Sequence, residues 1–323
     1  MKNILVLGGT GFVGRALCER LVQRNGGSGG RILVPTRRQA HGQRLQSLPT
    51  LEVLQADVHD PATLARLLAQ ADAVVNLVAI LHGSAAQFEA VHVELPRRLL
   101  QACLSAAERR APMRLLQVSA LGVGADAPSH YLRSKTAGEA LVKAAAGVAS
   151  TVFRPSVIFG AEDQFLNLFA TLQRLAPLLP LAGSSARFQP VWVEDVASAI
   201  VAALDRPDSI GKTYELTGPQ VYALSDLVRL AGRWSGHERA QIALPEALGR
   251  LQALAMEWLP GTPLMSRDNI DSMKTPNVAS GQWPGLKDLG VQASALEAVA
   301  PQYLGPHFAR ARLDGWRRQA GRH

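Results

Sequence analysis

The chain has 323 residues, of which 47% are hydrophobic and 19% charged, so it can bury a full core and hold one large domain plus a smaller one. Its formal net charge is +8, but no nucleic-acid-reading motif accompanies the basic residues, so a nucleic-acid partner is not expected. No uninterrupted apolar run is long enough to span a membrane, and the apolar N-terminus has no basic leader, which favours a cytoplasmic protein.

An apolar strand predicted at residues 3–7 runs into a glycine-rich turn, and an apolar-periodic helix follows to Arg24. The turn consists of Gly8, Gly9, Thr10, Gly11, Phe12, Val13 and Gly14. Gly8 suits a tight turn, Gly11 lets the backbone approach a phosphate, and Gly14 lets the helix pack on the strand. Because unpaired amides and the positive end of the helix dipole face such a turn, dinucleotide pyrophosphate is the expected ligand. A glycine-rich turn without a ligand is the alternative.

Apolar strands then alternate with helical patterns, which predicts an α/β fold with a doubly wound parallel sheet of the Rossmann type. Further strands are expected at 32–34, 51–54, 73–78, 115–118 and 151–153. Helices are expected at 61–69, 88–107 and 131–146. Such sheets bind ligands at the carboxyl ends of their strands. Cys18 and Cys103 lie in apolar helical patterns and are expected as buried free thiols, and no metal-binding cluster is visible.

The end of the second strand bears on the choice of nucleotide. An acidic residue there would bind the ribose hydroxyls of NAD, whereas this chain has Arg37 and Arg38. Guanidinium groups suit a 2′-phosphate through forked, charge-assisted hydrogen bonds, which favours NADP(H) over NAD(H). A solvated arginine pair is the alternative. Asp57, after the third strand, is placed to accept from the adenine amino group, and residues 76–79 would form the wall beside the adenosine ribose.

Tyr131 and Lys135 are the candidate catalytic pair. Four residues apart, they share one face of the predicted helix. An ammonium near a phenol favours the phenolate, so Lys135 is expected to lower the pKa of Tyr131, which would pass a proton during hydride transfer. Lys135 would also hold the nicotinamide ribose. Alone, such a pair is typical of a helix surface, but the glycine-rich turn ahead of it favours catalysis.

With these motifs the chain resembles the short-chain dehydrogenase/reductases, in the extended or atypical branch related to NAD-dependent epimerases and dehydratases. The motifs stand in family order: residues 8–14, Asp57-Val58, Asn76-Leu77-Val78-Ala79, Tyr131-Leu132-Arg133-Ser134-Lys135 and Arg154-Pro155-Ser156. The resemblance implies that Val58, Val78 and Ala79 belong to the cofactor site. It also implies that Pro155 and Ser156 lie near the nicotinamide.

A narrower likeness is carried by residues 131–135, 159–167 and 268–278. These segments resemble the NAD(P)H-binding accessory subunit of respiratory complex I and its stand-alone bacterial relatives. In that family the mitochondrial member binds NADPH tightly as a structural element. The resemblance therefore leaves two functions open: an NADP-dependent oxidoreductase, or a non-catalytic NADPH-binding protein that serves assembly or stability near a respiratory or quinone-related membrane system.

Ser119 departs from the catalytic pattern of the family. Working members place a Ser or Thr after the fifth strand, and here only Ser119 is available, one or two positions earlier than usual. Ser119 either orients the substrate or hydrogen-bonds the end of the strand and points away from the site.

We expect a dinucleotide-binding domain at 1–160 and a smaller mixed α/β lobe at 161–323, from which segments such as 187–204 can return to the first domain. The expected elements of the lobe are strands near 188–193 and 213–216, helices at 196–204 and 224–234, and an amphipathic pattern at 244–259 that packs in the core or on another helix. Candidate pocket residues, each of which could instead cap or pack, are Gln164, Asn167, Arg187, Gln189 and Trp192.

The C-terminal end of the chain is locally basic. Its arginines and the apolar residues among them are Arg310, Arg312, Arg317, Arg318, Arg322, Phe308, Leu313 and Trp316. An anionic membrane surface or a larger protein complex fits this pattern better than a nucleic acid. Peripheral contact with the inner membrane surface is therefore an alternative to a freely diffusing cytoplasmic protein.

Overall fold

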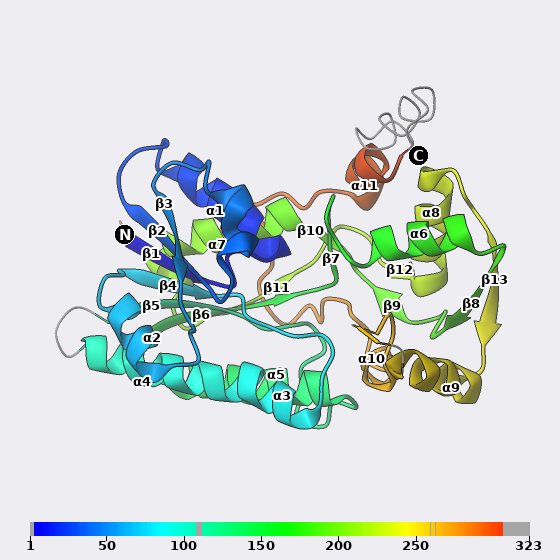
Figure 1. Cartoon of the computed structure of the whole chain (residues 1–323), viewed down its shortest axis with the longest axis horizontal. Coiled ribbons are helices and arrows are strands. Elements are labelled where there is room, and N and C mark those ends of the chain that lie inside the picture. Colours follow the sequence, from blue (N-terminus) through cyan, green and yellow to red (C-terminus); the bar gives the residue numbers. More distant parts are fainter. Residues whose placement is uncertain (1–2, 108–111, 259, 262, 306–323) are drawn as a thin grey trace. The chain divides into compact units, whose positions relative to one another are not determined.

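The structure, a computed structural model, describes residues 3–107, 112–258, 260–261 and 263–305. The described residues divide into two compact units (Figure 1). Unit 1 draws on Met1–Pro155, Val193–Leu216 and Ala279–Gln292, and unit 2 draws on Ser156–Trp192, Thr217–Val278 and Ala293–His323. The chain returns to unit 1 twice. The expected boundary near residue 160 allowed for the return of segments such as 187–204, and the segments that return are 193–216 and 279–292, while 187–192 stay in unit 2.

The sheet of unit 1 is parallel throughout, which confirms the predicted doubly wound fold (Figure 1). In order across the sheet, its described strands are β11 (Thr213–Leu216), β6 (Ala149–Pro155), β5 (Arg114–Val118), β4 (Ala73–Asn76), β1 (Asn3–Leu7), β2 (Arg31–Thr36) and β3 (Leu51–Gln55). Leu5, Val6 and Val75 in its middle are fully buried. Their burial reflects the helices that cover both faces of a parallel sheet.

β4 ends before the predicted strand at 73–78 does, and Asn76 is the reason. Its side-chain Oδ1 accepts from the amide of Val78 at 3.2 Å, and its Nδ2 donates to Gln117 Oε1 of β5 at 2.9 Å. This local bond offers the backbone an alternative to the sheet ladder. The chain therefore leaves the sheet after Leu77, whose amide still donates to the carbonyl of Leu7 at 3.0 Å.

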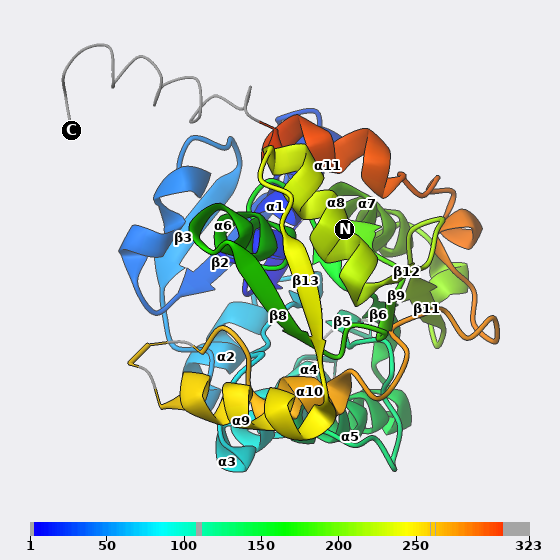
Figure 2. The ribbon, with the colours of Figure 1, turned by 90° about the vertical axis from the view of Figure 1, so that its right-hand side faces the viewer.

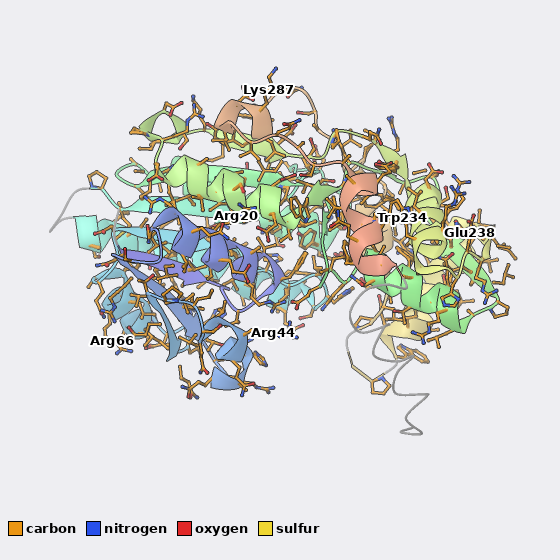
Figure 3. The ribbon with its side chains drawn as sticks, turned by 90° about the horizontal axis from the view of Figure 1, so that it is seen from above. Arg20, Arg44, Arg66, Trp234, Glu238 and Lys287 are labelled. Carbon is orange, nitrogen blue, oxygen red and sulfur yellow. The ribbon has the colours of Figure 1, made fainter. Side chains whose placement is uncertain are left out.

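Helices cover both faces of the sheet in unit 1 (Figure 1). On one face lie α1 (Phe12–Arg24) and α7 (Val193–Leu204), and on the other lie α2 (Pro61–Leu68), α4 (Leu95–Ala107) and α5 (His130–Ala144). Arg20 of α1, labelled in Figure 3, donates to Glu194 of α7 at 2.8 Å. Cys18 and Cys103 are free and fully buried, as predicted, and burial raises the pKa of each thiol to about 12.

The single helix predicted at 88–107 is interrupted. α3 (Ala85–Glu89) is followed by a π-helical turn at Ala90–Glu94 and only then by α4. Pro96 has no amide hydrogen, so the carbonyl of His92 has no α-helical donor four residues on, and the chain widens there. That carbonyl lies against Gly138 of α5, where a Cβ atom would overlap it.

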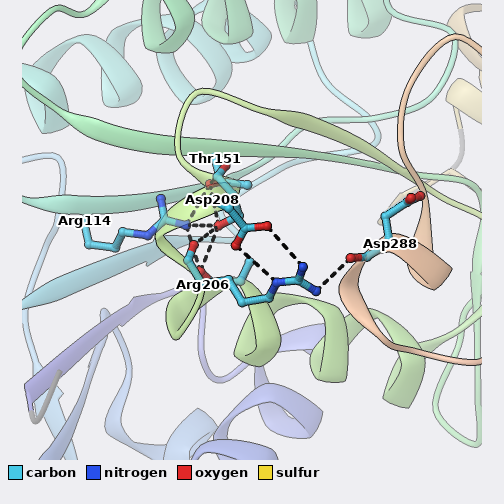
Figure 4. A network of polar contacts seen from close by, with 7 residues as sticks. Arg114, Thr151, Arg206, Asp208 and Asp288 are labelled. Carbon is cyan, nitrogen blue, oxygen red and sulfur yellow. Dashed lines mark hydrogen bonds and ion pairs between the residues drawn. The ribbon is translucent and has the colours of Figure 1, made fainter.

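A buried arginine holds the first returning segment, residues 193–216, in place through hydrogen bonds. Arg114 of β5 is 2% exposed. Its Nη1 donates to the carbonyl of Ala149 at 2.8 Å. Its Nη2 donates to the carbonyl of Ala203 at 2.9 Å and to the hydroxyls of Thr151 and Ser209, each at 2.7 Å (Figure 4). The helix expected at 196–204 is α7 of unit 1, in agreement with the expected return of segments such as 187–204, while strand 213–216, expected in the smaller lobe, also belongs to unit 1. The strand pairs with β6, and the helix packs on α1.

Shorter helical turns complete unit 1. They are η1 (Gln39–Leu45), η3 (Pro207–Ser209) and η4 (Leu286–Leu289). Near the Arg114 network, Arg206 pairs with Asp208 and donates to the carbonyl of Asp288 in η4 at 2.7 Å (Figure 4). The last returning segment is also held by its Trp283 ring, which lies 4.8 Å from Lys143 Nζ.

Unit 2 is built from short strand pairs and helices (Figure 2). The strand pairs are β7 (Ile158–Phe159) with β10 (Val191–Trp192), β9 (Arg187–Phe188) with β12 (Tyr222–Ala223), and β8 (Leu178–Ala182) with β13 (Ala240–Leu244). The helices are α6 (Leu166–Leu175), α8 (Leu224–Ser235), α9 (Glu246–Glu257), α10 (Arg267–Ser272) and α11 (Leu296–Leu304). The one strand predicted near 188–193 is therefore two, because Pro190 between them cannot donate to a ladder. A core around Phe159, Phe169 and Leu227 joins α6, α8 and α11.

Three expectations from the sequence concern the C-terminal arginines, membrane-spanning helices and metal-binding groups. The arginines from Arg310 to Arg322 lie outside the described residues. Within the described ranges, no helix is long and apolar enough to cross a membrane. Among the same residues, no group of His, Cys, Asp or Glu side chains could hold a metal ion.

Candidate functional site

The glycine-rich turn after β1 has the close packing that its spacing predicts. Gly8 has a φ of +80°, and a Cβ atom on it would lie 3.2 Å from the carbonyl carbon of Leu77 and the amide nitrogen of Val78. The amide of Gly11 donates to the carbonyl of Gly8 at 3.0 Å. A Cβ atom on Gly14 would overlap that same carbonyl. The shape of the turn therefore depends on the absence of side chains at Gly8 and Gly14.

The N-terminus of α1 opens at this turn. Gly11 is its N-cap and has no side chain to accept from the first helical amides, and the first turn has no acidic residue. Those amides have no carbonyl partner within the helix, and they carry the positive end of its dipole. A phosphate group is the kind of ligand that satisfies them. Thr10 supports the turn through its carbonyl, which accepts from Arg15 Nη1 at 2.8 Å.

Arg37 and Arg38 follow β2 directly, beside the strand that carries the glycine turn, and both are exposed. The hydroxyl of Thr36 donates to the carbonyl of Arg38 at 3.1 Å and holds the start of the loop. Neither guanidinium has a hydrogen-bond or ion-pair partner in the described part of the chain. Both cationic groups are thus available to an anionic ligand.

The ends of β3 and β4 lie along the same edge of the sheet. Asp57 is exposed, and its Oδ1 accepts from the amide of His59 at 3.0 Å, so it sits in a tight turn ahead of α2. Val58 and Val78 pack against the core of unit 1, while Ala79 is exposed. The structure therefore brings the glycine turn and these residues to the carboxyl edge of one sheet.

Tyr131 and Lys135 lie in the first half of α5, which begins after the N-cap Ser129. The Tyr131 ring meets the His92 ring edge-on, with centroids 5.5 Å apart, and the Phe88 ring at 6.1 Å. Lys135 is 5% exposed, and its Nζ donates to the carbonyl of Val118 at 2.8 Å.

The electrostatic expectation for this pair is wrong in the structure. Burial raises the pKa of the Tyr131 phenol to about 12. Burial also lowers the pKa of Lys135 to about 8, against the opposing effect of the Glu139 carboxylate. Desolvation disfavours the charged form of each group, and the Lys135 ammonium is engaged by a backbone carbonyl. A lowered Tyr131 pKa is therefore not a property of the protein by itself.

Ser119 lies one residue beyond the carbonyl that binds Lys135. It is 5% exposed, and its amide donates to the carbonyl of Phe153 at 2.7 Å. Its Oγ is buried and has no hydrogen-bond partner among the described residues. The backbone of Ser119, and not its hydroxyl, thus bonds the strand end. An unpaired buried hydroxyl costs about 1–3 kcal/mol, which a ligand at this position would recover.

The residues carried over from the Arg-Pro motif lie in different units. The carbonyl of Pro155, the last residue of β6, accepts from the amide of Leu121 at 3.0 Å. Ser156 begins unit 2, where its Oγ donates to Asn277 Oδ1 at 2.6 Å. Their position near the nicotinamide stays a prediction.

The candidate pocket residues of the smaller lobe mostly have structural contacts. Asn167 donates to the carbonyl of Asp163 at 3.1 Å, and Gln189 donates to the carbonyl of Gly218 at 2.8 Å. Trp192 packs against the core of unit 2. Gln164 and Arg187 are exposed.

Sequence reasoning missed His92. Its Nδ1 lies 2.8 Å from Ser134 Oγ, and its Nε2 accepts from the amide of Ile80 at 3.2 Å. The signal that could have found it is Pro96, which breaks the helical pattern four residues later.

A glycine turn at the head of α1, free arginines after β2 and a Tyr131–Lys135 pair on α5 together define a Rossmann-type protein with the residue pattern of the short-chain dehydrogenase/reductases. Residues 4–217 match the NAD dependent epimerase/dehydratase family, and the chain belongs to this family.

Similar proteins agree with this placement. The chain is 31% identical over 324 residues to NADH dehydrogenase (ubiquinone) 1 alpha subcomplex subunit 9, mitochondrial, from Arabidopsis thaliana, a match that covers 94% of this chain and 79% of that protein. It is 29% identical over 247 residues to the ceramide reductase of Caulobacter vibrioides, covering 75% of this chain and 74% of the reductase. The crystal structure of a DesIV double mutant, a dTDP-glucose 4,6-dehydratase from Streptomyces venezuelae with NAD and DAU bound, shares the fold. Its TM-score is 0.71 at 20% identity, over 97% of this chain and 98% of that one.

Proposed function

We propose that this protein binds a nicotinamide dinucleotide at the carboxyl edge of the unit 1 sheet, and that it prefers NADP(H) to NAD(H). The observation that carries the preference is the end of β2, where Arg37 and Arg38 are exposed and have no partner in the described ranges. No acidic residue occurs between Pro35 and Gln39 to bind a free ribose 2′-hydroxyl.

The residues present fit such a ligand. The glycine turn is packed too closely to admit side chains at Gly8 or Gly14, and the amides of the α1 N-terminus would hold the pyrophosphate. Arg37 and Arg38 would hold the 2′-phosphate. Asp57 would accept from the adenine, and Lys135 would hold the nicotinamide ribose.

The preference is tested by replacing both arginines with alanine. Calorimetric titration of Arg37→Ala/Arg38→Ala should show NADPH affinity reduced at least about tenfold, which is about 1.4 kcal/mol, with NADH affinity changed less than about twofold. Arg66→Ala is the matched control, because Arg66 (Figure 3) is an exposed arginine of unit 1 on α2. Equal losses for both nucleotides, or no loss, would remove the 2′-phosphate assignment.

We further propose that the protein is an oxidoreductase, which uses the bound nucleotide for hydride transfer. A bound nicotinamide supplies or accepts a hydride at carbon. The chain would then contribute Tyr131 as proton donor or acceptor, Lys135 as the cation that stabilises the phenolate, and Ser119 as the hydroxyl that orients the substrate. The buried, unpaired Ser119 hydroxyl supports this role. With its pKa raised by burial, Tyr131 is a neutral phenol in the protein without nucleotide, which is the form that donates a proton.

A structural role for the nucleotide is the second candidate. The observation that favours it is the 31% identity to a protein named as a subunit of NADH dehydrogenase. A nucleotide that binds only the folded state stabilises it by mass action. The exchange rate of bound NADPH against labelled NADPH separates the two candidates. Release within seconds supports turnover, and retention for hours supports a structural cofactor.

A further inference from the structure

His92 makes a hydrogen bond with each of its ring nitrogens. It is 3% exposed and lies in the π-helical turn at Ala90–Glu94. The amide of Ile80 can only donate, so Nε2 accepts this bond at 3.2 Å. In a neutral imidazole the proton then lies on Nδ1, which donates to Ser134 Oγ at 2.8 Å.

The chain of bonds continues into the Tyr131 helix. Ser134 Oγ accepts from His92 and donates to the carbonyl of Tyr131 at 2.8 Å. Each donor in this series is used once, so the arrangement fixes one tautomer of His92 and one orientation of the hydroxyl. Burial, together with the nearby Lys135 charge, lowers the pKa of His92 to about 3, which keeps the ring neutral at physiological pH.

One face of α5 contacts the π-helical turn at Ala90–Glu94. Tyr131, Ser134 and Gly138 are spaced by three and four residues, so they lie on the same side of the helix. Tyr131 meets the His92 ring edge-on, Ser134 bonds its Nδ1, and Gly138 leaves room for its carbonyl. π-helical turns of this kind occur frequently at functional sites.

The other end of this chain of hydrogen bonds, at Ile80, lies near the carboxyl edge of the sheet, where the nucleotide is expected to bind. Ile80 ends the segment that leaves β4, and this segment begins at Leu77 and Val78, whose backbone lies against Gly8 of the glycine turn. A displacement of Ile80 would thus act on the wall next to the predicted dinucleotide. The His92 ring, which contacts the Tyr131 ring, therefore also holds the Leu77–Ile80 segment through its hydrogen bond to the Ile80 amide.

We propose that His92 is a positioning residue that couples the Leu77–Ile80 segment to the Tyr131 helix as a neutral Nδ1–H imidazole. The functional consequence of this coupling rests on the proposed nucleotide binding. The tautomer of His92 and its hydrogen bonds to Ile80 and Ser134 do not depend on that proposal. With His92 in place, the Leu77–Ile80 segment and the Tyr131 phenol keep a fixed position relative to each other. Without His92 the Leu77–Ile80 segment moves away from the nucleotide more often, and bound NADPH dissociates faster.

The test has a structural and a functional readout. In the wild-type protein, ¹⁵N NMR of the histidine side chains should show His92 as the Nδ1–H tautomer, without protonation down to about pH 5. In His92→Phe, which keeps an aromatic ring but removes both bonds, the Ile80 amide should exchange with solvent at least about tenfold faster while the amide of Val75 in β4 keeps its protection. The NADPH dissociation rate should rise at least about tenfold.

Two further variants keep the test decisive. Ser134→Ala leaves the Ile80 bond in place and removes only the hydrogen bond between His92 and α5, so it can replace His92→Phe if that variant does not fold. It should raise the NADPH dissociation rate while leaving Ile80 protected. His237→Phe is the control: it changes a histidine of unit 2 that takes part in none of these contacts, and it should leave both readouts unchanged.

The outcomes separate this inference from the proposed function. An Nε2–H tautomer, unchanged Ile80 exchange in His92→Phe, or a dissociation rate within twofold of wild type in both variants would overturn the positioning role. Failure of the wild-type protein to bind NADPH would overturn the proposed function instead, and the tautomer and Ile80 exchange would still report on His92.

Discussion

Lys135 illustrates how the surroundings of one side chain decide its chemistry. Its spacing from Tyr131 predicts a cation that lowers the pKa of the phenol, whereas its depth and the Val118 carbonyl reverse that expectation. Spacing along a helix tells which residues share a face, but desolvation depends on the elements that pack over that face. The sequence could therefore predict the pair, and it could not predict the pKa values.

The lowered pKa of Lys135 makes the stability of the protein depend on pH. The folded state holds this lysine with a pKa of about 8, and the unfolded chain holds it near its ordinary 10.5. Between these values the unfolded state binds the proton and the folded state does not, so stability rises with pH. The contribution of Lys135 should be up to about 1.4 kcal/mol per pH unit across this window.

Urea denaturation at several pH values measures this contribution as a difference between variants. Lys135→Met should remove the rise between about pH 8 and pH 10 relative to wild type. Lys287→Met changes an exposed lysine of unit 1 (Figure 3) and should leave the pH profile unaltered. A Lys135→Met profile parallel to that of wild type would contradict the buried charge.

At the scale of elements, the glycine turn was predictable and the interrupted helix was not. Gly8, Gly11 and Gly14 have positions that follow from backbone sterics alone, so their spacing was sufficient. The break at His92 arises because Pro96 removes a donor and because Gly138 of another helix admits the freed carbonyl. Its position depends on a tertiary contact that no local periodicity contains.

Gly14→Ala tests the packing of the turn. The added methyl would overlap the carbonyl of Gly8, so the turn must shift, and we expect a loss of about 1–3 kcal/mol in the free energy of unfolding together with at least about tenfold weaker NADPH binding. Gly124→Ala is the control, because, apart from its chain neighbours, no atom of the described residues lies within 4 Å of its added Cβ. NADPH binding by Gly14→Ala within twofold of wild type would contradict the tight turn.

At the scale of the whole molecule, the alternation of strands and helices predicted the sheet, while the path of the chain through two units was only partly predictable. Strand 213–216 was recognised as a strand, but its pairing with β6 depends on contacts across many residues. The same is true of Arg114, whose partners come from β6, α7 and η3. A lone arginine in an apolar strand gives no sign of which distant carbonyls will surround it.

Arg114→Met should therefore destabilise unit 1 strongly. It leaves buried oxygens of the returning segment without their donor, and we expect a loss of about 3 kcal/mol in the free energy of unfolding. Arg206→Met removes an exposed ion pair next to the same network and should cost less than about 1 kcal/mol. Denaturation in urea measures both, and similar losses for the two variants would contradict the structural role of Arg114.

The threading of unit 1 has a consequence for how the protein is made. A ribosome releases the first six strands of the sheet well before it releases β11, so the growing chain presents the open side of β6 to its surroundings while unit 2 residues are still being added. Unpaired strand edges of this kind are templates for association with other chains. We therefore expect nascent chains to need shielding of β6 until residue 216 has emerged, and we expect a fragment that stops at residue 160 to associate with other chains through that edge.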